Sequence, residues 1–278
     1  MKKIFFYSLL FLLKQSSLIA QQRYNFVISS ITGERLPYAS ILWGKANGLS
    51  CNEQGICSFT SITKIDSFVF SNVGYKDSLQ LSANFKPIND TIYIQLQALS
   101  KKLPDAIVIA NGKLIEAGTI ATKANSYILN NTPKHLITAL RVESQKEISK
   151  IISLSVFIAR GSTIELPLRI RIYNSNNNLP FEDILIDNVV LKDYKVNAWN
   201  EIFLEDSNLF LRKGIYFIGI EWLCTEQTKQ NGLRVGILMS KQQIQQTFYQ
   251  HSNRKWVKDT VTVDGESENI MLKIKLLQ

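Results

Sequence analysis

Residues 31–75 read ITGERLPYASILWGKANGLSCNEQGICSFTSITKIDSFVFSNVGY, and this stretch decides the fold. Short apolar runs alternate in it with turns that contain Gly, Asn, Asp or Pro, which are the ordinary turn residues. The pattern predicts strands at residues 38–43, 49–51, 56–60 and 67–71. Strands this short, bounded by turn signals on both sides, are typical of an all-β sandwich.

The flanking segments extend the same pattern. Residues 24–29 and 92–97 place a large apolar side chain at every second position, which is the period of a half-buried strand. A further short strand is expected at residues 78–81. Residues 22–98 therefore hold seven expected strands, and we predict two packed antiparallel sheets.

An ordered set of residues in this stretch matches a known pattern. The set is Gly33, the run Leu36 to Ala39, Gly44, Gly48, the turn Asn52 to Gly55, Phe59, Asp66 and the run Ser71 to Tyr75. The order resembles that of carboxypeptidase-like regulatory domains, which are small transthyretin-like β-sandwiches. The resemblance implies a transthyretin/Ig-like seven-stranded sandwich and a protein of the Gram-negative cell envelope. It names no ligand.

Two cysteines, Cys51 and Cys57, flank the turn NEQG, in which Gly55 fits the left-handed position of a three-residue hairpin. If Asn52 and Ile56 form its closing hydrogen-bonded pair, the cysteines face each other with Cα atoms about 4.5 Å apart. This separation is at the short end of the disulfide range. A disulfide and a pair of buried reduced thiols both remain open, whereas a zinc site lacks further ligands nearby.

The first twenty residues have the layout of a secretory signal peptide. Lys2 and Lys3 precede an apolar run at residues 4–13, which is too short to span a bilayer. Removal of residues 1–20 takes away three lysines and no acids, so the formal charge falls from +9 to +6. We expect an exported protein of the periplasm, outer membrane or cell surface, with no transmembrane segment in the mature chain.

The chain divides near residue 100, where the composition changes to the polar run SKKLP. We predict a signal peptide (1–20), a regulatory-like domain (22–98), a hinge (99–104) and a second domain (105–278). Residues 115–140 show no clear period and favour a short helix or a wrapping loop.

Strand signals return from Ile151 onward. Eight apolar runs with polar turns between them predict a second β-sandwich, for which a jelly roll is one arrangement. The runs are 151–159, 164–173, 181–186, 189–196, 199–204, 215–223, 233–239 and 269–277.

Residues suited to catalysis or metal binding are scarce. Zinc peptidases bind the metal through two His and a carboxylate, but this chain has only His135 and His251 and no HExxH motif. A GxSxG nucleophile elbow is also absent from the sequence. We therefore expect no metal, no cofactor and no catalytic residue.

Aromatic and basic side chains are the candidate binding residues. Trp199, Tyr173, Arg169 and Arg171 are expected to form a ligand-binding surface, because rings bury a large area with few rotatable bonds. Trp222 lies in an apolar run and is expected in the core. Lys and Arg are scattered among Asp and Glu, so the clustered charge of a nucleic-acid-binding surface is not expected.

These observations favour a non-catalytic exported envelope protein that acts as a structural or interaction module. Its expected partner is an envelope protein or a glycan, with no nucleic acid. One alternative is a glycan-binding accessory protein of a nutrient-uptake system. The other alternative is an enzyme of unknown type.

Overall fold

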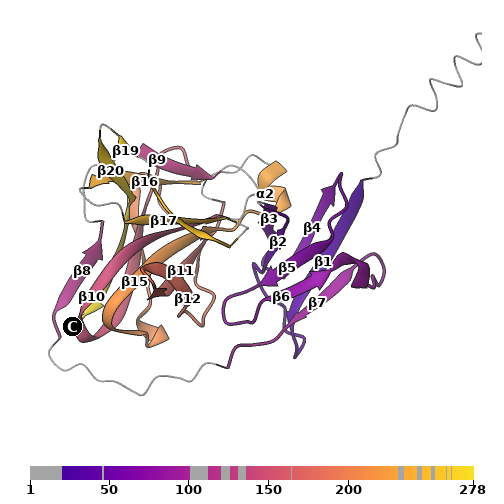
Figure 1. The fold of residues 1–278 in the computed structure, drawn as a ribbon, viewed down its shortest axis with the longest axis horizontal. Coiled ribbons are helices and arrows are strands. Elements are labelled where there is room, and N and C mark those ends of the chain that lie inside the picture. Colours follow the sequence, from indigo (N-terminus) through magenta and orange to yellow (C-terminus); the bar gives the residue numbers. More distant parts are fainter. Residues whose placement is uncertain are drawn as a thin grey trace, which may run out of the picture.

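The chain is an all-β protein, as the sequence predicts. We treat its strands as two units, β1–β7 and β8–β21 (Figure 1). The computed structural model describes residues 21–45, 47–100, 112–119, 126–130, 136–163, 165–230, 235–242, 246–251, 254–260, 262–263 and 265–278. The expected signal peptide and residues 101–104 of the expected hinge lie outside these residues. No helix in the described part of the chain has the length and apolar character needed to cross a bilayer.

The first unit is a sandwich of two sheets around an aromatic core. Its strands are β1 (Gln22–Ser30), β2 (Ser40–Trp43), β3 (Asn47–Ser50), β4 (Ile56–Ser61), β5 (Ser67–Ser71), β6 (Ser78–Leu81) and β7 (Ile92–Leu96). One sheet has the order β4-β1-β7, and the other has the order β3-β2-β5-β6. The rings of Tyr24, Phe26, Phe59 and Phe68 pack between the sheets with centroids 5.1 to 6.4 Å apart. All seven expected strands are present close to their predicted bounds.

The prediction that both sheets are antiparallel is wrong for the sheet that contains β1. β1 pairs antiparallel with β4, where Phe26 lies beside Cys57, but parallel with β7, where Phe26 lies beside Ile92. The chain reaches β7 after β6 of the opposite sheet, and it enters at the same end as β1. The period-two pattern determines which face of β7 is buried. The same pattern is compatible with a parallel or an antiparallel neighbouring strand, so it does not predict the direction of pairing.

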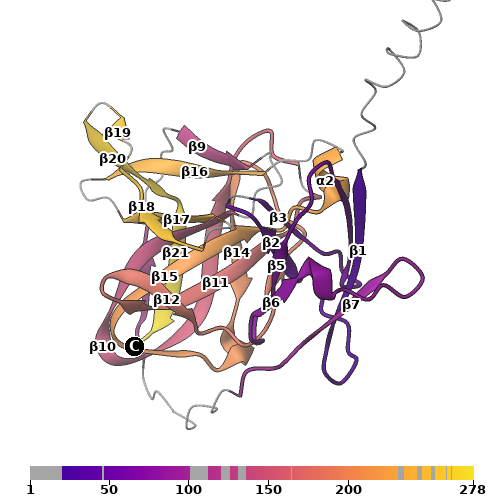
Figure 2. The same ribbon diagram turned by 45° about the vertical axis from the view of Figure 1, so that its right-hand side comes forward.

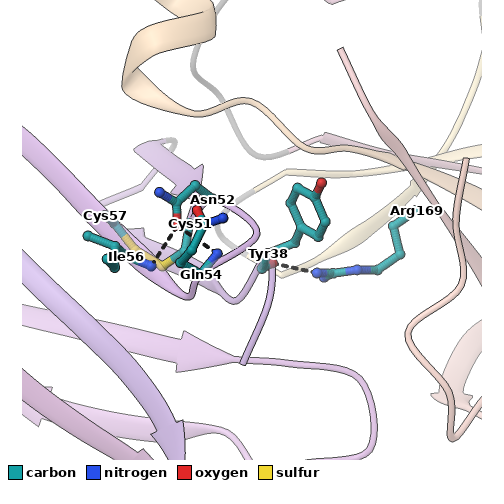
Figure 3. Close-up of a disulfide and its surroundings, with 7 residues drawn as sticks. All are labelled: Tyr38, Cys51, Asn52, Gln54, Ile56, Cys57 and Arg169. Carbon is teal, nitrogen blue, oxygen red and sulfur yellow. Dashed lines mark hydrogen bonds between the residues drawn. A yellow bond between two sulfur atoms is a disulfide. The ribbon is translucent and has the colours of Figure 1, made fainter. Parts of the chain in front are cut away.

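A disulfide joins Cys51 to Cys57 across the NEQG turn (Figure 3). The Asn52 amide donates to the Ile56 carbonyl at 3.0 Å, and the two Cα atoms lie 4.5 Å apart, the separation that this pairing predicts. Gly55 has φ +67°, and an added Cβ would lie 2.8 Å from a backbone carbonyl oxygen of β1. The expected hairpin ladder does not form, because β3 and β4 belong to different sheets. The disulfide therefore links the two sheets at a corner of the sandwich.

Peptide mapping of the unreduced protein is expected to find Cys51 joined to Cys57 and Cys224 as a free thiol. Cys224 is buried, and burial raises its pKa to about 12, so little thiolate forms near neutral pH. Alkylation of the folded protein at pH 8 should spare all three cysteines, and alkylation after denaturation should label Cys224 alone. Labelling of Cys51 and Cys57 in the denatured, unreduced chain would show instead that the pair is reduced.

The second unit is organised around one long strand, β10 (Leu136–Ile158). The first part of β10 pairs with β15 (Phe210–Trp222) and β17 (Thr247–His251), and its last part pairs with β14 (Ala198–Phe203) and β21 (Leu272–Leu277). Its register with β15 shifts between Ser144 and Ile148, an irregularity of the kind that bends a strand. The other elements are β8 (Leu114–Gly118), β9 (Ser126–Asn130), β11 (Leu168–Asn176), β12 (Leu179–Asp183), β13 (Val190–Leu191), α2 (Glu226–Gln230), β16 (Val235–Gln242), β18 (Trp256–Lys258), β19 (Thr262–Val263) and β20 (Glu266–Ile270).

Two local predictions for the second unit are wrong. The stretch 115–140 was expected to be a helix or loop, but its described residues include β8, β9 and the start of β10. β8 and β9 are short strands without a clear apolar period. β8 is stabilised by pairing with β21, and β9 is stabilised by pairing with β16. The expected strand 189–196 is reduced to β13 (Val190–Leu191), and the Tyr194 hydroxyl donates to the Leu166 carbonyl at 2.8 Å.

Strand β11 is buried on both faces. One face packs in the core of the second unit, and the other face meets the first unit. Leu168, Ile170 and Ile172 belong to the main core of the second unit. Arg169 and Arg171 lie on the opposite face, and Arg169 contacts the first unit directly. Both views place the β3-β2-β5-β6 sheet of the first unit toward the second unit (Figures 1 and 2).

Candidate functional site at the seam between the units

One loop of the first unit inserts into the second unit, and we name residues 71–75 the docking loop. Val73 is 4% exposed and belongs to the main core of the second unit, together with Leu185. Gly74 has φ +78°, and a Cβ on it would lie 2.8 Å from the Ile186 carbonyl oxygen. The run Ser71 to Tyr75, which is part of the family resemblance, therefore docks the two units.

A buried ionic network holds the units together beside the docking loop. One oxygen of the Glu221 carboxylate accepts hydrogen bonds from Arg169 Nη1 at 3.1 Å and from Arg171 Nε at 2.8 Å. The other oxygen accepts from the hydroxyl of Ser40, in the first unit, at 2.8 Å. Arg171 Nη1 also donates to Asp183 at 2.7 Å. Two guanidinium groups thus meet two carboxylates, so the network is balanced in charge.

Arg169 also reaches across the seam to the backbone of the first unit. Its Nη2 donates to the Tyr38 carbonyl oxygen (Figure 3), and its Nε donates to Asn188 Oδ1 at 2.8 Å. Asn188 Nδ2 in turn donates to the Pro37 carbonyl oxygen at 3.1 Å. Loss of the guanidinium group would take this donor from the buried Tyr38 carbonyl oxygen and would leave Glu221 with one guanidinium partner fewer.

The electrostatics of this network favour its charged form. Burial lowers the pKa of Arg169, and the charge of Glu221 opposes that effect, so the guanidinium stays protonated near neutral pH. Burial also acts to lower the pKa of Arg171, but the charges of Glu221 and Asp183 raise it above its ordinary value. Burial raises the pKa of the Tyr173 hydroxyl, which therefore stays neutral.

Exposed contacts surround the buried network. Lys192 Nζ pairs with the Glu53 carboxylate at 2.5 Å and lies 5.7 Å from the centre of the Tyr38 ring. The hydrogen bond from Lys192 lowers the pKa of the Glu53 carboxyl. Arg254 pairs with Asp77 at 2.6 Å. Both pairs join one unit to the other, and exposed pairs of this kind orient surfaces more than they stabilise them.

An interdomain cleft of about 440 Å³ lies beside the network. This volume is within the range of about 300–1,000 Å³ that is usual for small-molecule sites. The Tyr173 and Trp256 rings meet edge to face in its wall, with centroids 5.2 Å apart and planes at 74°. The cleft is lined by Leu42, the docking loop and Asp77 from the first unit, and by Ile137, Arg171, Tyr173, residues 181–183, Leu185, Gln250, Arg254 and Trp256 from the second.

The structure separates the four predicted binding residues into three places. Tyr173 and Arg171 line the interdomain cleft. Arg169 is completely buried in the ionic network, so it holds the units together and is not open to a ligand. Trp199 lies elsewhere, on β14, where its ring packs on Phe157 at 5.4 Å and Lys273 Nζ lies 5.0 Å from its centre. Trp199 pairs with the end of β10 that is remote from β11, so the expected single surface does not form.

Sequence reasoning missed two residues of the site. Glu221 stands alone as a charge within the apolar run YFIGIEWL, and a lone carboxylate in such a run signals a buried ion pair. Asn72 was interpreted only as part of the family-like run. Its Oδ1 is buried at the cleft and has no hydrogen-bond partner among the described residues. No sequence signal identified that atom.

The described part of the chain contains no cluster of three or more His, Cys, Asp or Glu residues that could hold a metal ion. His135 and the side chain of His251, the candidate ligands in the sequence, lie outside what the structure describes. In the cleft, Asp183 and Asp77 are each held by an arginine. The arrangement is therefore chemically suited to recognition by shape, rings and hydrogen bonds.

Comparisons with known proteins show distant likeness in fold alone. No family model matches the chain, and no curated protein matches it. A structure of the clostridial cysteine protease Cwp84 after propeptide cleavage is similar with 11% identity and a TM-score of 0.47, over 65% of this chain and 43% of that chain. A structure of the cysteine protease and lectin-like domains of Cwp84, a surface layer associated protein of Clostridium difficile, is similar with 10% identity and a TM-score of 0.43. The match covers 62% of this chain and 37% of that chain. The chain spans less than half the length of these two structures, and the likeness carries no argument about function.

Proposed function

We propose that this chain is a non-catalytic, exported envelope protein whose two β-sandwich units act together as one interaction module. The observation that carries the proposal is the buried network of Glu221, Arg169 and Arg171, which reaches Ser40 and Tyr38 of the first unit. Breaking such a network exposes uncompensated buried charge, so the two units are held in one relative position. A binding surface that draws residues from both units is then preorganised.

The charges around the interdomain cleft support recognition in preference to catalysis. A general acid or base needs a titratable group that can exchange a proton with its substrate. Asp183 accepts a hydrogen bond from Arg171 at 2.7 Å, and Asp77 pairs with Arg254 at 2.6 Å. Both carboxylates are therefore structural partners of guanidinium groups.

Export is the part of the proposal with a direct test. When the full chain is produced in a Gram-negative host, intact mass of the envelope and periplasmic fractions should show the loss of about twenty residues. The motivation is the order of Lys2, Lys3 and the apolar run 4–13. A variant with Leu9 and Leu10 changed to Arg breaks that run and should remain full-length in the cytosol. Recovery of the unaltered chain at full length in the cytosol would remove the exported role.

A further inference from the structure

The interdomain cleft is electrostatically suited to an uncharged ligand. Its two arginines are paired with carboxylates, Arg171 with Asp183 and Arg254 with Asp77. A charged ligand would have to displace one of these partners or bind beside a neutral pair. Glu182 lies at the same cleft, and its amide and carboxylate both contact Asn174. An uncharged ligand therefore leaves both ion pairs intact, and the Glu182 carboxylate disfavours an anionic ligand.

The aromatic side chains of the cleft offer apolar surface to such a ligand. Trp256 is half-buried, and Tyr173 supports it edge to face at 5.2 Å. Phe181 is 56% exposed and lines the same cleft, together with Tyr75 of the docking loop. Rings held in this way bury a large area with little loss of conformational entropy. A ligand with a flat apolar face can pack on them.

One acceptor in the cleft points to a ligand that donates hydrogen bonds. Asn72 is 7% exposed, and its Oδ1 has no partner among the described residues. A buried carbonyl oxygen without a donor is unfavourable, so a ligand hydroxyl or N–H group that reached Asn72 Oδ1 would relieve this cost. Gln250 lines the cleft as well and can both donate and accept.

We infer that the interdomain cleft binds a sugar ring of an uncharged glycan, an inference that rests on the proposed interaction function. A pyranose ring combines the required features: no charge, an apolar face of C–H groups for Trp256, and hydroxyls that can donate to Asn72 Oδ1. A peptide fits less well. Its backbone carbonyls need donors, and both arginines of the cleft already pair with carboxylates, Arg171 with Asp183 and Arg254 with Asp77.

The test measures binding of neutral oligosaccharides to the purified mature chain by calorimetric titration. The probes are oligosaccharides of glucose, mannose, galactose, xylose and N-acetylglucosamine. At least one should bind, and Trp256→Ala and Asn72→Leu should each weaken it about tenfold or more. Trp256→Phe keeps a ring and should retain part of the affinity. The matched control is Trp199→Ala, which removes a ring remote from the cleft and should bind as the unaltered chain does.

Three results would overturn the inference. The first is that no neutral oligosaccharide binds the folded chain. The second is that binding survives Trp256→Ala and Asn72→Leu but is lost in Trp199→Ala. The third is that uncharged peptides or acidic glycans bind the cleft in place of neutral sugars. Unfolding curves of each variant show whether it is folded. If Asn72→Leu does not fold, the comparison of Trp256→Phe with Trp256→Ala still tests the inference. Failure here leaves the export result intact, so the two proposals fail separately.

Discussion

Replacing Glu221 by glutamine is expected to lower the free energy of unfolding by about 3–5 kcal/mol, the usual effect of removing one member of a buried ion pair. Glutamine has nearly the same shape, so the change removes a charge and little volume. It leaves Arg169 and Arg171 buried together without their shared carboxylate, on a face where Arg169 is completely buried. Urea denaturation of the mature chain measures the loss.

The matched control for this prediction is Glu201→Gln. Glu201 also accepts from a serine, Ser153, and pairs with a lysine, Lys275 at 2.7 Å. Its side chain is 34% exposed, and Lys275 is 29% exposed, so solvent screens the pair. The expected loss is below about 1 kcal/mol. Equal losses in the two variants would mean that burial of the Glu221 network does not determine its contribution.

Replacing Gly74 by alanine is expected to separate the two units without unfolding either of them. The added Cβ would lie 2.8 Å from the Ile186 carbonyl oxygen, a distance that requires the backbone of one unit to move. When the docking loop moves, Val73 would be withdrawn from the main core of the second unit. Thermal unfolding should change from one transition to two, and protease should cut faster between Ala98 and Pro104, at the expected hinge.

Gly33→Ala is the matched control for the docking loop. Gly33 has φ +87°, close to the +78° of Gly74, and a Cβ there would have no atom within 4 Å. Both substitutions carry the conformational cost of about 1–2 kcal/mol for a left-handed residue. Only Gly74→Ala adds the clash between units. A single transition in both variants would contradict the docking role of Gly74.

The first unit could be predicted closely from its sequence, strand by strand. Its apolar runs are short and its turns carry Gly, Asn or Pro, so local preference and tertiary structure agree. The turn NEQG even predicts the 4.5 Å separation of Cys51 and Cys57. What the pattern did not contain was the parallel pairing of β1 with β7, because alternation describes faces and not directions.

The second unit and the site were predicted less well. Of the four predicted binding residues, Tyr173 and Arg171 line one cleft, where the Tyr173 ring meets that of Trp256. Trp199 is expected on the same surface, but it lies elsewhere. β14 and β11 pair with different parts of the β10 and β15 framework, and this separates Trp199 from the cleft.

By itself the sequence determined an all-β chain, a turn that brings Cys51 to Cys57, and the alternation that places Leu168, Ile170 and Ile172 in a core. These features depend on residues close together in the chain, where backbone preference and side-chain period act directly. Only the tertiary structure decided that the opposite face of β11 meets the first unit. Ser40 and Glu221 form their hydrogen bond across 181 residues, and Arg169 and Glu221 across 52. Contacts this distant depend on strand order and on the docking of the two units, which no local pattern encodes.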